Sequence, residues 1–346
     1  FFELGGDSIL AIQAVSYAAR QGLHFSVRDL FRAQTIRSLA KRATHGTRVE
    51  AAQEAVEGEL LLLPIQQEFF RDETALHHFN QSVFLEVPDE LTAPLLTQMV
   101  EKLYHRHDAL RLVFTKLGGQ WQAEHKSLTD SLPGASVEVK DMGNADSQAV
   151  QAYANQIQQS LNPETGLLMR AVLMTGLSTG NKLLVVVHHL VVDGVSWRIL
   201  LADLERLFTQ HLKGKMLSLS NKTSSYQQWA NFLSEFSKSP ALLAEKRFWQ
   251  GVLEKGADTF SAVATSENSM PAGTGEVNIE LDKTLTKQLL NQSHKSYRTK
   301  INELLLAGLL LAVYRSWDKT SLRLDLEGHG REVLTERLDL SQTVGW

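Results

Sequence analysis

The spacing of hydrophobic residues changes at one point of the chain in a way that separates a strand from a helix. Residues 184–187 form a continuous run of leucine and valine, which predicts a buried β-strand. From Val195 onward the apolar residues recur at helical spacing instead. They are Leu200, Leu201, Leu204, Leu207, Phe208 and Leu212. The pattern therefore predicts a strand, a short turn and an amphipathic helix in that order.

The predicted turn contains four residues with chemical or conformational properties of their own. They are His188, His189, Asp193 and Gly194. Asp can bond to its own backbone and Gly accepts a positive φ without steric cost, which suits a turn. Histidine titrates near physiological pH, so an imidazole fixed at a strand end can act as a general base. A lone histidine is more often a satisfied core residue, but two in succession beside an Asp-Gly turn favour a functional site.

The rest of the chain from residue 60 alternates short strand-like runs with amphipathic helices, which indicates an α/β fold. In the first series we expect strands at 79–87, 110–114 and 168–173, and helices at 91–108 and 147–161. In a second series after Tyr226 we expect helices at 227–237 and 242–253, one from 284 and one at 301–317, with strands at 277–281 and 322–326. Two series of this kind predict two similar lobes.

The composition limits the number of domains, the partners and the kinds of site that the chain can have. The 346 residues, 43% of them hydrophobic, are enough for two or three domains, and none is a cysteine. No apolar stretch approaches the roughly 20 residues that span a bilayer, so we expect a cytoplasmic protein without a membrane partner. A net charge of −4 gives no basic surface for nucleic acid. His77, His78, His105 and His107 complete no metal-ligand spacing, so no metal is expected and their roles are interpreted as structural.

The N-terminal segment carries the sequence Leu-Gly-Gly-Asp-Ser-Ile at residues 4–9, directly before a helical pattern. Ser8 then falls at the helix start, where an N-cap is its simplest role. Two more short helices are expected, one opened by Ser26 and one at 35–43. This segment resembles the carrier (thiolation) domain of nonribosomal peptide synthetases. The resemblance implies a small all-α bundle at residues 1–43, cut short at its start, with 4′-phosphopantetheine attached to Ser8 by a phosphopantetheinyl transferase.

Residues 44–58 lose apolar periodicity and are interpreted as a mobile linker. Beyond it, the motifs at 63–67, 105–111 and 225–230, together with the double-histidine turn, occur in the order of the condensation-domain superfamily of the same synthetases. The resemblance implies two lobes similar to chloramphenicol acetyltransferase. The expected boundaries are 59–225 for the N-terminal lobe and 226–346 for a C-terminal lobe that is truncated.

Three sequence blocks resemble the epimerization subfamily in particular. They are residues 191–200, the Glu-Gly-His-Gly-Arg-Glu block at 327–332, and 343–346. Inverting an aminoacyl or peptidyl thioester at Cα requires a base and an acid on opposite faces, with charge developing on the thioester oxygen between them. By the resemblance His189 and Glu327 are that catalytic pair. Which of them deprotonates the L-isomer stays open.

Other residues of these blocks have supporting interpretations. His188 is expected to orient the site by hydrogen bonding, and Asp193 to act as a turn or salt-bridge group. His329 is either without a role or holds Glu327. Arg331 is expected to pair with Glu327 or with the phosphodiester of the arm.

Two rival functions remain. A condensation domain uses the same double-histidine turn to form a peptide bond between two carrier-bound substrates, and an inactive docking module would only receive the carrier. The epimerase interpretation implies as partners a carrier-tethered thioester, an upstream adenylation domain and a downstream condensation domain or module.

Overall fold

The fold is that of a computed structural model in which most of the chain from Phe1 to Trp346 is described. The description leaves out residues 2–5, 7–9, 12–13, 16, 19–20, 26, 34, 46–50, 73–75, 132–133, 144, 255–276, 294–298, 300, 333 and 336. Ser8, the expected attachment residue, lies outside the described residues. In the described part of the chain no helix combines the length and apolar character needed to cross a membrane.

The N-terminal segment contains the expected short helices and one feature that the all-α expectation missed. Helix α2 (Val27–Ala33) and helix α3 (Ile36–Ala40) confirm two of the predicted helices, although α3 ends before residue 43. Thr35 begins α3 because its side chain accepts a hydrogen bond from the Ser38 N–H at 3.3 Å. Strands β1 (Leu23–His24) and β2 (Thr44–His45) pair antiparallel across this segment, so it is not purely helical.

The second half of the expected linker is bound to the domain that follows it. The side chain of Gln53 bonds both the backbone N–H and the carbonyl of Lys222, and the carbonyl of Val56 accepts from Arg111 at 2.8 Å. The Val56 N–H donates to Asp108. These bonds hold this part of the expected linker against the domain that follows, where the buried Asp108 and Arg111 side chains bond the backbone of Val56.

Two sheets form the body of the next part of the chain. A three-stranded antiparallel sheet has the order β3-β6-β5, and a four-stranded sheet has the order β4-β9-β8-β7, in which only β7 and β8 are parallel. The strands are β3 (Gly58–Leu60), β4 (Asn80–Glu86), β5 (Leu112–Leu117), β6 (Gln120–His125), β7 (Val137–Asp141), β8 (Met169–Thr175) and β9 (Lys182–His188). Strand β9 is buried along its whole length, which explains its continuous apolar run.

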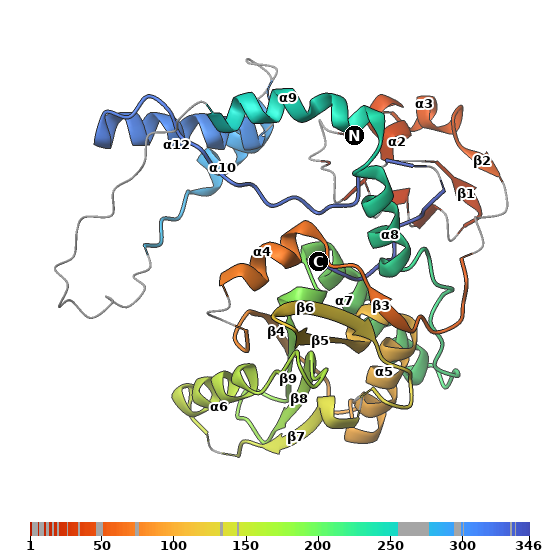
Figure 1. Ribbon diagram of the computed structural model, residues 1–346. Helices are drawn as coiled ribbons and strands as arrows, with labels where there is room; N and C mark the ends of the chain where they lie inside the picture. The colour runs from red at the N-terminus through yellow and green to blue at the C-terminus, as the bar shows by residue number, and fades with distance from the viewer. Residues whose placement is uncertain are drawn as a thin grey trace.

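Helices cover both faces of the four-stranded sheet. The helices of this part are α4 (Pro64–Asp72), α5 (Ala93–Arg106), α6 (Ser147–Gln159) and α7 (Gly194–Leu212), with single turns η2 (Asp108–Arg111) and η3 (Gly134–Ser136). Alternate residues of β8 and β9 pack with α5 and α7 in the main core, and the residues between them pack with α6 in a smaller one. Figure 1 shows α5 and α6 at opposite sides of this sheet. The predicted helices at 91–108 and 147–161 and the predicted strands at 79–87 and 168–173 are confirmed, each to within two residues at its ends. The strand expected at 110–114 begins only at Leu112, because residues 108–111 form η2.

The second series forms helices but not strands in the described residues. Its helices are α8 (Tyr226–Phe236), α9 (Pro240–Glu254), α10 (Lys283–Gln288), a π-helical turn η5 (Leu289–Ser293) and α12 (Ile301–Trp317). The strands expected at 277–281 and 322–326 are wrong, because neither segment pairs with a neighbouring strand among the described residues. Figure 1 shows α9, α10 and α12 apart from the sheets, beyond α4 and α8.

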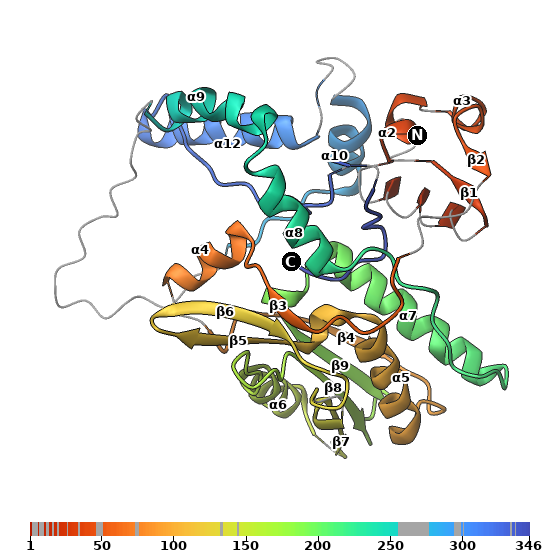
Figure 2. The same cartoon turned by 45° about the vertical axis from the view of Figure 1, so that its right-hand side comes forward.

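Residues 318–346 return from α12 to the sheet-containing part. In both views the C-terminal end lies among α4, α7 and α8 (Figures 1 and 2). The last residues pack on the main core, in which Val344 is buried. This return brings residue 327 and its neighbours back to the turn after β9.

We expect Leu207→Ala to lower the free energy of unfolding by about 2–5 kcal/mol, because Leu207 of α7 is fully buried and its removal leaves a cavity. Leu212→Ala on the same helix removes the same atoms from a side chain that is 56% exposed, and should cost less than about 1 kcal/mol. Urea unfolding followed by tryptophan fluorescence measures both. Equal losses would contradict the placing of α7 on the core.

Candidate functional site

The junction after β9 positions the expected site residues. Strand β9 ends at His188, a single 3-10 turn η4 (His189–Val191) follows, and Asp193 begins α7 by accepting the Ser196 N–H at 2.7 Å. Gly194 is the first residue of α7 and is not among the glycines with positive φ. The expectation that Gly194 supplies a left-handed turn conformation is therefore wrong. An added Cβ would meet nothing within 4 Å.

His188 is a buried residue that holds the junction together. Its Nε2–H donates to the Leu76 carbonyl at 2.7 Å and its Nδ1 accepts from the Leu190 N–H at 3.2 Å. Burial lowers the pKa of His188 to about 4, which the bond to Leu76 only partly opposes. The imidazole is thus neutral near pH 7, and both of its nitrogens are engaged with backbone groups. This geometry orients the turn and leaves His188 no free nitrogen for proton transfer.

His189 faces a different environment from its neighbour. Its backbone N–H donates to the Phe79 carbonyl at 2.8 Å, and its ring stacks on the Phe79 ring with centroids 4.7 Å apart and planes 13° apart. Within the described structure its buried Nδ1 has no hydrogen-bond partner. The side chain as a whole is half-buried. His189 is therefore fixed in orientation by ring stacking while its nitrogens are not consumed by structural bonds.

A buried ion pair joins Asp193 to Arg331. Both Arg331 terminal nitrogens bond the Asp193 carboxylate, and Arg331 Nη2 also donates to the carbonyls of Thr343 and Gly345 at 3.1 Å. The two side chains are 8% and 9% exposed. The expected pairing of Arg331 with Glu327 is not found, because the guanidinium bonds Asp193 and backbone carbonyls. Its pairing with the phosphodiester of the arm stays a prediction. Asp193 is a capping and salt-bridge group.

Glu327 and His189 both contact the side chain of Trp346. The indole Nε1–H of Trp346 donates to Glu327 Oε1 at 2.8 Å, and the Trp346 ring lies 4.9 Å from the His189 ring, centroid to centroid. Trp346 also packs on Phe79, with centroids 5.4 Å apart. The Glu327 side chain is exposed and the Trp346 residue half-buried. Two residues 138 positions apart are thus brought to one site.

His329 serves its own loop rather than Glu327. Its Nδ1 accepts the Arg331 N–H at 3.0 Å and lies 3.9 Å from Glu332 Oε1. The group that bonds Glu327 is Trp346, a role that the sequence interpretation did not give to it. Among the described residues, no group of three or more His, Asp or Glu side chains is arranged to hold a metal ion.

Sequence reasoning also missed Gln66. Its side chain is fully buried, accepts from the Leu63 N–H at 3.0 Å and donates to the Leu190 carbonyl at 3.2 Å. The bond to Leu190 supports the turn directly after His189. The available signal was an amide placed among apolar residues in the motif at 63–67, since a buried amide needs hydrogen-bond partners.

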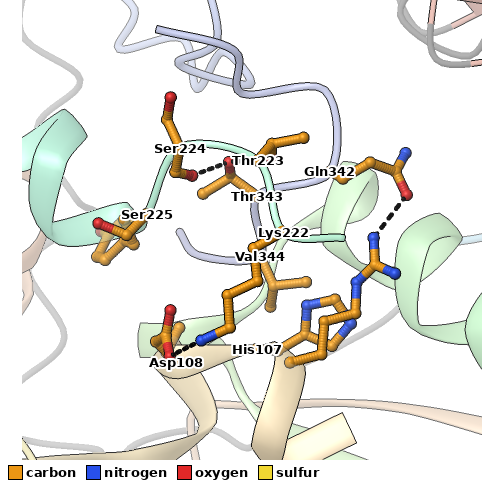
Figure 3. A pocket seen from close by; sticks show the side chains of 12 residues that line it. His107, Asp108, Lys222, Thr223, Ser224, Ser225, Gln342, Thr343 and Val344 are labelled. Atoms are coloured by element: carbon orange, nitrogen blue, oxygen red, sulfur yellow. Dashed lines mark hydrogen bonds and ion pairs between the residues drawn. The ribbon is translucent and has the colours of Figure 1, made fainter. Parts of the chain in front are cut away.

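Side chains around a small polar pocket of about 20 Å³ hold the C-terminal segment in place (Figure 3). Thr343 donates to the Ser224 carbonyl at 2.6 Å, and Gln342 accepts from Arg106 at 3.3 Å. His107 at its wall bonds Asp203 at 2.8 Å, and burial lowers the pKa of His107. Its interpretation as a structural residue rather than a metal ligand fits these contacts. These contacts and the bonds from Arg331 to the Thr343 and Gly345 carbonyls hold the segment directly before Trp346.

Comparison with known families covers nearly the whole chain. The family model described as a condensation domain matches residues 56–346, and the one described as a phosphopantetheine attachment site matches residues 1–43. A linear gramicidin synthase of Brevibacillus parabrevis is 41% identical over 355 residues, covering 100% of this chain and 7% of that protein. Bacitracin synthase 3 of Bacillus licheniformis is 36% identical over 348 residues, covering 100% of this chain and 5% of that protein.

Solved structures agree on the fold. The epimerization domain from the third module of tyrocidine synthetase B has a TM-score of 0.72 and 32% identity, covering 87% of this chain and 67% of that one. The first condensation domain of the CDA synthetase has a TM-score of 0.54 at 14% identity, covering 75% and 62%, and shows a shared fold alone.

Fold and site together define a condensation-like α/β enzyme domain with lobes of the chloramphenicol acetyltransferase type, preceded by a carrier segment. The chain belongs to the condensation domain family of nonribosomal peptide synthetases. Its first 43 residues belong to the phosphopantetheine attachment family, so 4′-phosphopantetheine is its cofactor. The chain spans less than a tenth of the length of the two curated relatives described above.

Replacing Arg331 by Met should destabilise the fold by about 3–5 kcal/mol, since it leaves the buried Asp193 carboxylate without its counter-charge. Arg71→Met is the matched control. Arg71 pairs with Glu68 at 2.7 Å on the surface, where the side chains are 72% and 65% exposed, so its loss should cost less than about 1 kcal/mol. Urea unfolding of both variants measures the difference, and a small loss for Arg331→Met would contradict the proposed anchoring.

The lowered pKa of His188 makes stability depend on pH in a defined direction. Between pH 6.5 and about 4 the unfolded chain binds a proton at His188 that the folded chain does not, so stability falls as the pH falls through this window. His188→Gln removes this titration while keeping an amide donor. Unfolding free energies at pH 7, 6 and 5 should show a shallower slope for the variant, at about 1.4 kcal/mol per pKa unit of difference. An unchanged slope would refute the assignment.

Proposed function

We propose that the chain epimerises the Cα of an L-aminoacyl or peptidyl thioester held on the phosphopantetheine of its own carrier domain. The observation that supports this function is that Trp346 contacts both candidate proton-transfer groups, bonding Glu327 at 2.8 Å and packing 4.9 Å from His189. Because Glu327 and His189 come from separate chain segments that meet at Trp346, they are the candidates for the acid and the base that act on one Cα. The similarity to an epimerization domain at 32% identity also favours it.

The proposed mechanism uses one group that removes a proton and a second group that returns one. One of His189 and Glu327 removes the Cα proton, charge develops on the thioester oxygen, and the other group returns a proton to the opposite face. His189 suits either role because a neutral imidazole can accept a proton and an imidazolium can return one. Its ring orientation is fixed by contacts with Phe79 and Trp346, which use neither ring nitrogen. The direction for the L-isomer is left open.

The phosphopantetheine arm, when attached to the carrier segment, supplies the thioester that holds the substrate. Ser8 is the attachment residue in this proposal, and the domain boundaries are 1–43 for the carrier segment, 44–58 for the connection, 59–225 for the first lobe and 226–346 for the second. Residues 10, 11, 14, 15, 17 and 18, which follow Ser8, are helical, consistent with a hydroxyl at a helix start. A phosphopantetheinyl transferase, an upstream adenylation domain and a downstream condensation domain or module are the proposed partners.

The alternative is a condensation domain. It is favoured by the family model described as a condensation domain, which matches residues 56–346. It requires a second carrier-bound substrate and forms an amide, whereas an epimerase exchanges the Cα hydrogen with solvent. The two functions therefore differ in products that can be measured in one experiment.

The decisive measurement uses the full-length protein that contains this chain, loaded with an L-aminoacyl phosphopantetheine and incubated in D₂O. We expect deuterium at Cα together with the D-isomer, detected by mass and chiral analysis. His189→Ala and Glu327→Gln should each slow exchange by ~10²- to 10⁴-fold, because each removes one proton-transfer group.

Glu332→Gln is the matched control. Glu332 lies in the same block as Glu327, but its side chain is 60% exposed and points to His329, so exchange should stay within about threefold of wild type. Wild-type exchange in Glu327→Gln would exclude the carboxylate. Amide formation with a second loaded carrier and no exchange would establish the condensation function instead.

A further inference from the structure

The carboxylate of Glu327 lies at the surface and is held by one contact. Glu327 is exposed, and within the part of the chain that the structure describes the indole Nε1–H of Trp346 is the one group that donates to it, at 2.8 Å to Oε1. A glutamate side chain without a partner samples several rotamers, so it does not keep one oxygen in one place. The bond from Trp346 is therefore what orients this carboxylate.

Trp346, in contrast, is held from several directions. Its carbonyl accepts from the Tyr226 hydroxyl, and the N–H of Gly345 directly before it donates to Ser196 Oγ at 3.1 Å. Gly345 has no room for a side chain, because an added Cβ would lie 2.3 Å from the Tyr226 ring. The indole ring packs against Phe79 with centroids 5.4 Å apart. A donor fixed in this way can impose its position on an exposed acceptor.

The same indole also contacts His189. The two ring centroids are 4.9 Å apart and the ring planes are inclined by 56°. A ring contact of this kind needs no hydrogen bond, so Trp346 keeps its N–H for Glu327 and His189 keeps its nitrogens for proton transfer. One side chain therefore relates the position of the carboxylate to that of the imidazole.

We propose that Trp346 is a positioning residue for the proton-transfer pair. Its N–H holds Glu327 Oε1, which leaves Oε2 as the oxygen that exchanges a proton with Cα. Both carboxylate oxygens carry lone pairs, so one can accept a hydrogen bond while the other acts as base or acid. Trp346 itself transfers no proton, because an indole N–H is only a donor. This inference rests on the proposed function and adds the residue that aligns its acid and base.

Losing this alignment has a consequence that a general loss of structure does not have. In wild type one group removes the Cα proton and the other returns a deuteron from D₂O to the opposite face, so each isomer exchanges and inverts. If only Glu327 is misplaced, His189 still deprotonates one isomer. The half-buried imidazole exchanges that proton with solvent and returns a deuteron to the same face. That isomer then exchanges without inverting, and the other isomer does neither.

The test compares Trp346→Phe with wild type in the full-length protein that contains this chain. The carrier is loaded with L-alanyl or D-alanyl phosphopantetheine and incubated in D₂O. Phenylalanine keeps the ring contacts and removes the N–H. Inversion of both isomers should fall by about 10- to 100-fold, the effect of losing a hydrogen bond to a charged group. One isomer alone should keep deuterium exchange close to the wild-type rate.

Trp249→Phe is the matched control. Trp249 makes the same kind of bond, from its Nε1–H to Glu245 Oε2 at 3.2 Å, but it is 54% exposed and lies on α9, which Figure 1 shows apart from the sheets. Both isomers should exchange and invert in this variant as in wild type. Equal losses of exchange for both isomers in Trp346→Phe, or inversion at the wild-type rate, would overturn the positioning role.

A second measurement examines the bond without turnover. With 5-fluorotryptophan in place of the six tryptophans of this chain, the ¹⁹F resonance of Trp346 is identified by its absence in Trp346→Phe. Glu327→Ala removes the acceptor and should shift this resonance, whereas Glu332→Ala should leave it in place. Glu327 is exposed, so its replacement should not disturb folding.

The outcomes separate this inference from the proposed function. An unshifted Trp346 resonance in Glu327→Ala would overturn the positioning role and leave the epimerase function standing. A shifted resonance together with exchange of one isomer alone in Trp346→Phe would support it. No exchange by wild type would overturn the proposed function, and with it the role of Trp346 in that reaction.

Discussion

The buried ion pair between Asp193 and Arg331 is the interaction on which the site depends. Asp193 caps the helix that follows the histidine pair, and Arg331 lies four residues after Glu327 and also bonds the carbonyls of Thr343 and Gly345. One guanidinium therefore ties three chain segments together. Breaking a buried pair leaves an uncompensated charge in a poorly hydrated place, so this arrangement is held firmly once it forms.

Neighbouring residues at the end of β9 acquire opposite properties from their surroundings. Successive side chains at a strand end point in different directions, so His188 faces the interior and His189 faces the aromatic group of Phe79 and Trp346. Backbone bonds consume both nitrogens of His188, and burial lowers its pKa. His189 is oriented by ring contacts that consume neither nitrogen.

The elements that the sequence predicted well are those whose stability is local or whose burial is complete. The backbone hydrogen bonds of helix α12 lie within the helix itself, so its sequence pattern was sufficient to predict it. Strand β9 is buried along its whole length, so it could be predicted from its continuous apolar run. The strands expected at 277–281 and 322–326 failed because a strand needs a partner, and none pairs with them in the described structure. Gly194 was misassigned since the cap of Asp193 already begins the helix there.

The sequence by itself determined the order of elements, the histidine pair at a strand end, the acidic block at 327–332 and the family resemblance, because periodicity and residue type are local properties. Only the tertiary structure decided which partners those residues have. Arg331 pairs with Asp193, Trp346 bonds Glu327, and residues 51–57 are bound to the first lobe. Each contact joins positions far apart in the chain, and several acceptors compete for every donor, so the packing of the whole molecule selects among them.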